Sequence, residues 1–194
     1  MAHHLSDIVG ESTYLLIDLP ETLLFAAAYL SLLNRDKTLY LYDKSDFEEV
    51  VRNRWEEYRF ILVPNYVLDD LRHLRLNLAI NVGSFQEMRT DQVESYLDFL
   101  RETLTSVLYS LNQDREPKNR ELSNLSNMLK DRFDCDGGLG TGLNRKQKMR
   151  MIAGESFNKL EKPVRRILGR ESVMSDDRRL LEYVCRARPR ESGW

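Results

Sequence analysis

Short apolar runs alternate with amphipathic stretches through the first 114 residues of the chain. Apolar runs of four to seven residues bounded by polar or turn residues are typical of buried strands, whereas apolar positions at three- and four-residue spacing are typical of helices. The pattern predicts strands at residues 14–17, 38–42, 60–64, 76–82 and 106–112. It predicts helices at residues 2–9, 20–33, 47–58 and 93–104.

This regular alternation predicts an α/β fold, with a Rossmann-like, mostly parallel sheet and helices on both faces. Ligands bind such sheets outside the carboxyl ends of the strands. The residues expected at these ends are Asp18, Pro64, Asn65, residues 81–87 and Asn112.

The pattern changes after residue 114. Residues 121–133 and 155–168 have helical spacing, residues 134–148 are expected to form a loop, and residues 179–189 are ambiguous between strand and helix. Gly138, Gly140 and Gly142 match G-x-G-x-G, but a polar run precedes them where a phosphate-binding turn needs an apolar strand. We therefore expect a partial Rossmann-like core at residues 1–114, and a basic, mainly helical region at residues 115–194 that packs on it.

The net charge of −2 is unevenly distributed, with −9 over residues 1–114 and +7 over residues 115–194. The basic residues of the second part alternate with acids and do not cluster with aromatics, which favours a solvated face over a nucleic-acid or membrane surface. No apolar run is long enough to span a bilayer, and the first ten residues do not follow a signal-peptide pattern. We therefore expect a cytoplasmic protein without nucleic-acid or membrane partners.

The cysteine and histidine positions give no sign of a metal site. Cys135 and Cys185 lie far apart without a paired spacing, which predicts two ordinary thiols in a reducing compartment and neither a disulfide nor a zinc site. His3 and His4 have no acid or cysteine at ligand spacing, and His73 stands alone in a polar stretch.

Asp18 is the first candidate for chemistry because it ends the apolar run at residues 14–17. The two oxygens of a carboxylate can accept hydrogen bonds from both vicinal hydroxyls of a ribose. An aspartate at this position can equally cap the helix that begins at Pro20. The pattern alone leaves both roles open.

Several motifs resemble, in order and spacing, the sugar O-methyltransferase family of S-adenosylmethionine-dependent enzymes. They are "IDLPETLLFAAAYLS", "FILVPN", "LNLAINVGSFQEM", "YLDFL" and "LYSLN", and they fall within residues 13–113. The most specific is N-x-x-SFQEM, formed by Asn81 and residues 84–88. The resemblance implies transfer of a methyl group from S-adenosylmethionine to a hydroxyl of a sugar or of a glycosylated small molecule.

The same resemblance implies roles for individual residues. Those implied to bind the cofactor are Asp18, Leu19, Pro64, Asn65 and Asn81; those implied to bind the substrate are Ser84, Gln86 and Asn112. Glu87 is implied to act as the base or to hold a sugar hydroxyl in catalysis, and Gln86 to hydrogen-bond that hydroxyl. Judged from the residues alone, Ser84 can instead be a helix N-cap, and Glu87 an acid favoured by a helix dipole.

The chain departs from the family before the DLP motif, where the first strand and the glycine-rich turn are missing and Gly10 is the one glycine. We therefore expect an N-terminally shortened member with an uncovered sheet edge and weak cofactor binding. One alternative is a non-catalytic interaction module, in which another chain or a second copy completes the sheet. Another is a coding sequence that begins further upstream.

Overall fold

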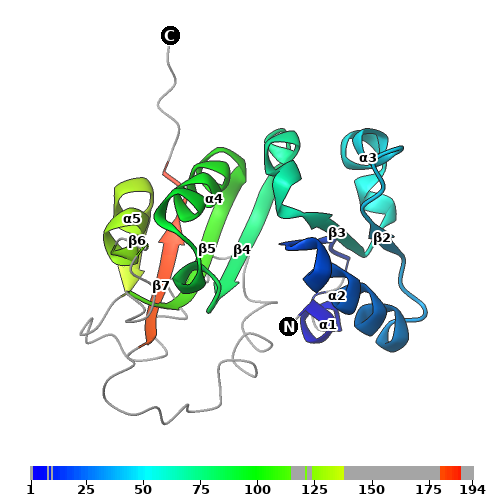
Figure 1. Ribbon diagram of the computed structural model, residues 1–194, viewed down its shortest axis with the longest axis horizontal. Coiled ribbons are helices and arrows are strands. Elements are labelled where there is room, and N and C mark those ends of the chain that lie inside the picture. The colour runs from blue at the N-terminus through cyan, green and yellow to red at the C-terminus, as the bar shows by residue number, and fades with distance from the viewer. Residues whose placement is uncertain are drawn as a thin grey trace. The chain divides into compact units, whose positions relative to one another are not determined.

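The computed structural model describes residues 2–7, 9, 11–114, 121, 124–137 and 180–188, and these fall into two compact units. The first unit contains the described residues up to Leu71, and the second contains the described residues from Arg72 onward. Both units combine helices with parallel strands (Figure 1). The α/β class predicted from the sequence is therefore confirmed.

The first unit is built on three parallel strands in the order β1-β3-β2, which span Tyr14–Asp18, Phe60–Pro64 and Leu39–Leu41. All five residues of β3 are buried, as expected for a central parallel strand that is covered on both faces. The register places Tyr14 opposite Phe60 and Asp18 opposite Pro64. The carboxyl ends of β1 and β3 therefore lie together at one edge of the sheet.

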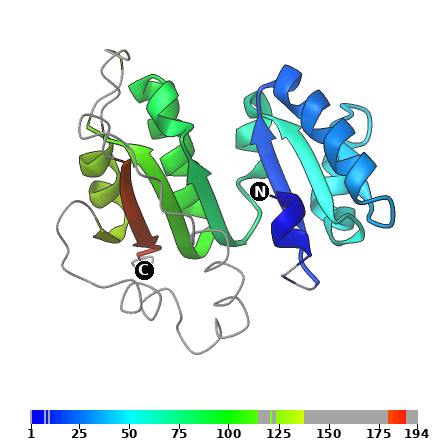
Figure 2. The same cartoon turned by 90° about the horizontal axis from the view of Figure 1, so that it is seen from below.

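Helix α2 (Pro20–Leu33) packs against β1 and β3 (Figure 2). Pro20 is accommodated in the first turn, where a missing N–H removes no helical hydrogen bond. Leu23, Ala27 and Leu30 form a buried cluster with side chains of β3. The other helical elements of the first unit are α1 (Ala2–Ser6), α3 (Phe47–Glu49), η1 (Val50–Arg54), η2 (Trp55–Glu57) and η3 (Asn65–Leu71).

The predicted helix at 47–58 changes its geometry along its length. Its first turn is α-helical, residues 50–54 form a wider π-helical turn, and residues 55–57 form a 3-10 turn. Phe47, Val50 and Val51 are all buried. The helical spacing therefore indicated which side chains of this segment face the core. It did not indicate the change of hydrogen-bonding pattern.

Arg59, just before β3, connects the N-terminal segment to the sheet through hydrogen bonds. Its guanidinium donates hydrogen bonds to the backbone carbonyls of Ser12 at 2.6 Å, Ser6 at 2.7 Å and Val9 at 2.5 Å. It also lies 5.1 Å from the centre of the Tyr14 ring, within the range of a cation–π interaction. One side chain thus satisfies three carbonyl groups that lie outside regular strand pairing.

The second unit contains a four-stranded sheet in the order β4-β5-β7-β6. The strands span Leu76–Val82, Leu104–Gln113, Leu180–Arg186 and Asp134–Gly137, in that order. β4 and β5 are parallel, and the chain passes between them through η4 (Phe85–Glu87) and α4 (Thr90–Thr103). β7 is antiparallel to both of its neighbours.

Helix α5 (Leu125–Arg132) lies beside α4 (Figure 1). An ion pair joins the two helices, since Arg132 Nε donates to the Asp98 carboxylate at 2.8 Å. Leu125, Met128 and Leu129 are buried, and the helix lies within residues 121–133, where helical spacing predicted one.

The region after residue 114 differs from the predicted helical extension. Residues 134–137, predicted as part of a loop, form β6, and the ambiguous stretch at 179–189 contains β7. In this region the described residues thus form two strands as well as one helix. The predicted boundary between residues 114 and 115 stays a prediction, and the helical pattern at 155–168 and the glycines at 138–142 lie outside the described residues.

The prediction of two ordinary thiols is wrong. Cys135 of β6 lies opposite Cys185 of β7, and a disulfide joins them. The pairing depends on the register of two antiparallel strands, which the spacing of the cysteines along the chain does not reveal. The disulfide also removes the argument that the cysteines indicate a reducing compartment.

In the described part of the chain, every helix is too short or too polar to cross a membrane.

We expect the Cys135→Ser substitution to lower the free energy of unfolding of the oxidised protein by about 2–4 kcal/mol, because the disulfide restricts the unfolded chain. Chemical denaturation of the wild type and the variant, with and without a reducing agent, measures the effect. The reducing agent should destabilise the wild type and leave the variant unchanged. A wild type insensitive to reduction would contradict the prediction.

Candidate functional site

Asp18 lies at the carboxyl end of β1 with its side chain exposed. Its Oδ1 accepts a hydrogen bond from the Leu19 N–H at 2.7 Å, and the described residues provide no further partner for the carboxylate. The N-cap residue of α2 is Leu19, and no side chain caps the helix. The capping role that the sequence left open is therefore absent, and the carboxylate has an oxygen available to a ligand.

Two exposed apolar side chains lie near Asp18 in the chain and in the register of the sheet. Leu19 is 54% exposed and Tyr66, two residues after Pro64, is 68% exposed. The Tyr66 ring meets the Tyr42 ring edge to face, with 6.0 Å between the ring centres. The sequence analysis missed Tyr66, although an aromatic residue directly after a strand that ends in a predicted ligand edge was a usable signal.

The Tyr42 phenol stays protonated at neutral pH. Desolvation raises its pKa above the usual value, and the nearby Tyr66 and Asp70 act in the same direction. The Tyr42–Tyr66 pair therefore adds an aromatic surface just after the carboxyl ends of β2 and β3.

Asn81 connects the predicted residues of the second unit. Its amide Nδ2 donates to Ser84 Oγ at 2.5 Å, and its Oδ1 accepts from Asn112 Nδ2 at 2.9 Å and from the Phe85 N–H at 3.3 Å. The structure therefore brings Asn81, Ser84 and Asn112 together at the carboxyl ends of β4 and β5. Ser84 is the N-cap residue of η4, but its side chain forms no cap hydrogen bond.

Gly83 makes the turn that leads from β4 into this cluster. Its φ of +74° is favourable for glycine and strained for other residues, and its N–H donates to the Leu111 carbonyl at 2.9 Å. The turn therefore joins the end of β4 to β5 while directing the chain toward Ser84.

Asn112 contains a buried acceptor. Its side chain belongs to a residue that is 1% exposed, and its Nδ2 donates to Asn81 and, at 2.9 Å, to Ser110 Oγ. Its Oδ1 has no hydrogen-bond partner within the described ranges. A buried carbonyl oxygen without a partner costs free energy, so this atom favours any donor that can reach it.

Gln86 and Glu87 differ in their surroundings. Gln86 Oε1 accepts the Gln113 N–H at 2.7 Å, which ties η4 to the end of β5. Gln86 Nε2 lies 3.5 Å from Glu87 Oε1, and Glu87 is exposed. Part of the Gln86 side chain thus has a structural role, whereas the Glu87 carboxylate faces solvent.

The predicted site residues form two clusters, one at the carboxyl edge of each sheet. The first unit holds Asp18, Leu19, Pro64 and Asn65, and the second holds Asn81, Ser84, Gln86, Glu87 and Asn112. Within the described ranges, no group of three or more His, Cys, Asp or Glu side chains is placed to hold a metal ion.

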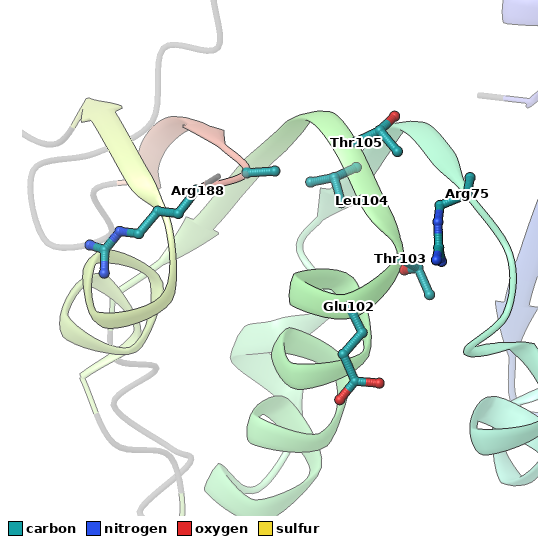
Figure 3. Close-up of a pocket in the computed structure, with 7 residues that line it drawn as sticks. Arg75, Glu102, Thr103, Leu104, Thr105 and Arg188 are labelled. Atoms are coloured by element: carbon teal, nitrogen blue, oxygen red, sulfur yellow. The ribbon is translucent and has the colours of Figure 1, made fainter. Parts of the chain in front are cut away.

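A surface hollow of the second unit lies at the other end of its strands, near the amino ends of β4 and β5 (Figure 3). Its lining residues are Arg75, Glu102, Thr103, Leu104, Thr105, Ala187 and Arg188. Two of its charged side chains form ion pairs: Glu102 with Arg72 at 2.8 Å, and Arg188 with Asp134 at 3.1 Å. The third, Arg75, donates a hydrogen bond to the Leu74 backbone carbonyl at 3.0 Å. The hollow is separate from the Asn81 cluster, because the two lie at opposite ends of β4 and β5.

No family model matches the chain, and no curated protein matches it. Among solved structures, one similar chain is the plantazolicin methyltransferase BamL in complex with a triazolic desmethylPZN analog and SAH. The identity is 12% and the TM-score 0.45, over 96% of this chain and 82% of BamL. At this low similarity, the ligands bound to BamL say nothing about what this chain binds.

We expect the Asn81→Ala substitution to destabilise the second unit by about 1–3 kcal/mol, because it leaves several polar groups around Asn112 without their partner. Asn77→Ala is the matched control on the same strand: its exposed amide makes one 3.4 Å contact with Thr105. Surface changes of this kind usually alter stability by less than about 0.5 kcal/mol. Denaturant unfolding of both variants measures the difference, and equal effects would contradict a central role for Asn81.

Proposed function

We propose that the protein binds S-adenosylmethionine and transfers its methyl group to a hydroxyl of a sugar or of a glycosylated small molecule. The observation that carries the proposal is the available carboxylate oxygen of Asp18 at the carboxyl edge of a parallel sheet. Ligands of open α/β sheets bind at this edge, and a carboxylate there can accept hydrogen bonds from ribose hydroxyls. The Leu19 N–H bonds one carboxylate oxygen, and the other has no partner among the described residues.

The surroundings of Asp18 suit the rest of a nucleoside. Leu19 and Tyr66 supply exposed apolar surface on which an adenine ring can pack. Pro64, which ends the neighbouring strand β3, and Asn65 come directly before Tyr66 in the chain. Aromatic and apolar side chains bind bases through stacking and burial. We assign this cluster to the adenosine part of the cofactor.

The Asn81 cluster supplies the polar groups that a sugar needs. Bound S-adenosylmethionine supplies an electrophilic methyl group on a positively charged sulfur. We propose that Ser84, Gln86 and Asn112 hydrogen-bond sugar hydroxyls, and that Asn81 orients Ser84 and Asn112 through its own hydrogen bonds. Orienting groups of this kind lower the barrier by holding the reacting oxygen in line.

Glu87 is the proposed general base. We assign to the Glu87 carboxylate the role of accepting the proton of the sugar hydroxyl that the cofactor would methylate. The exposed position of Glu87 next to Gln86 is compatible with this role, because the carboxylate can meet a substrate without first breaking an ion pair.

A second candidate function is a non-catalytic interaction module. Among the described strands, β1 pairs with β3 alone and β4 pairs with β5 alone, so each is the edge of its sheet. Edge strands are templates for pairing with another chain. This function predicts association without cofactor binding. The calorimetric measurement described next therefore distinguishes it from the first proposal.

We expect S-adenosylhomocysteine, the demethylated cofactor, to bind the wild type, and Asp18→Ala to weaken this binding roughly 10- to 100-fold. Loss of hydrogen bonds to a charged group costs about 1.5–3 kcal/mol. Isothermal titration calorimetry measures both affinities. Asp36→Ala, at an exposed acid in the turn after α2, is the control and should bind like the wild type. A wild type that fails to bind at millimolar ligand would refute the proposal.

We expect Glu87→Gln to slow methyl transfer by about 10²- to 10⁴-fold, the usual contribution of a general base. The measurement follows labelled methyl groups from S-adenosylmethionine into a panel of monosaccharides and nucleotide sugars. The affinity for S-adenosylhomocysteine should stay unchanged in this variant. Glu94→Gln on the exposed side of α4 is the control, and equal rates in Glu87→Gln and the wild type would exclude Glu87 as the base.

A further inference from the structure

Helix α2 is apolar on its outward side as well as on the side that packs against the sheet. The outward residues are 47–80% exposed and form what we name the α2 face, which consists of Leu24, Phe25, Tyr29, Leu32 and Leu33. Phe25 is the most exposed of them at 80%. Single exposed apolar residues are common, but a contiguous patch of this kind marks an interaction surface.

The α2 face contains no charge. Residues 22–34 lack any Asp, Glu, Lys or Arg, and the nearest charged residues are Glu21 at one end and Arg35 with Asp36 at the other. A solvated helix normally carries charged residues on its outward side. The sequence of α2 is therefore typical of a helix that is covered on both sides.

We propose that the α2 face binds the α2 face of a second copy of this chain, with the two helices antiparallel about a two-fold axis. A fully buried aromatic side chain hides roughly 150–250 Å². On that scale the exposed parts of the five side chains amount to about 500 Å² per copy. Two copies would bury at most about 1,000 Å², the lower limit for a specific interface.

A second copy suits this surface because a two-fold interface must be complementary to itself. An uncharged apolar stripe meets its own copy without opposing like charges. In the antiparallel arrangement, Glu21 of one copy lies toward Arg35 of the other, and the two helix dipoles oppose each other favourably. The interaction is independent of cofactor binding and stands whether or not the protein is a methyltransferase.

Analytical ultracentrifugation of the full chain over a range of concentrations tests the proposal. We expect the wild type to form a dimer, and Phe25→Glu to raise the dimer dissociation constant at least roughly 100-fold, because each interface would bury two carboxylates. Phe25→Leu keeps the apolar character and should still form a dimer. Phe25 is exposed, so circular dichroism should show that both variants remain folded.

Two outcomes would overturn the proposal. A wild type that stays monomeric throughout shows that another part of the chain, or nothing, covers the α2 face. A dimer that is equally strong in wild type and Phe25→Glu shows that the copies meet through another surface, such as the edge of β1.

Discussion

The parallel register of β1 on β3 is the constraint on which the candidate cofactor site depends. β3 is buried along its whole length, so its position is fixed by the core on both of its faces. Because β1 runs parallel to it with Asp18 opposite Pro64, the two strands end at the same edge. A shift of β1 by one residue would turn the apolar side chains of the strand to the opposite face and move Asp18 away from Pro64.

The second cluster is held together differently. Asn81, Ser84, Ser110 and Asn112 hold one another through side-chain hydrogen bonds, and Gly83 supplies the backbone turn that brings them together. Such a network is rigid when it is fully paired, and the exception is the Asn112 oxygen, which has no partner in the part of the chain that the structure describes.

The sequence predicted the order of elements well. Buried strands and their helices were found where apolar runs and helical spacing placed them, from Tyr14 through Gln113, because local periodicity reflects which side chains face a core. It also predicted that Asn81, Ser84 and Asn112 follow strand ends, and those residues are in contact. The role of each in binding or catalysis stays a prediction, since contact alone does not define a role.

Several features were decided by tertiary structure alone. The disulfide between Cys135 and Cys185 and the strand at 134–137 follow from the antiparallel pairing of segments separated by many residues, which local pattern does not encode. The exposure of Phe25 depends on which side of an apolar helix meets the sheet, and both sides look alike in sequence. Up to residue 113 the sequence thus determined which segments form strands and helices, because that choice rests on neighbouring residues. Their pairing and their exposed faces rest on contacts between distant residues, and only the folded chain decided them.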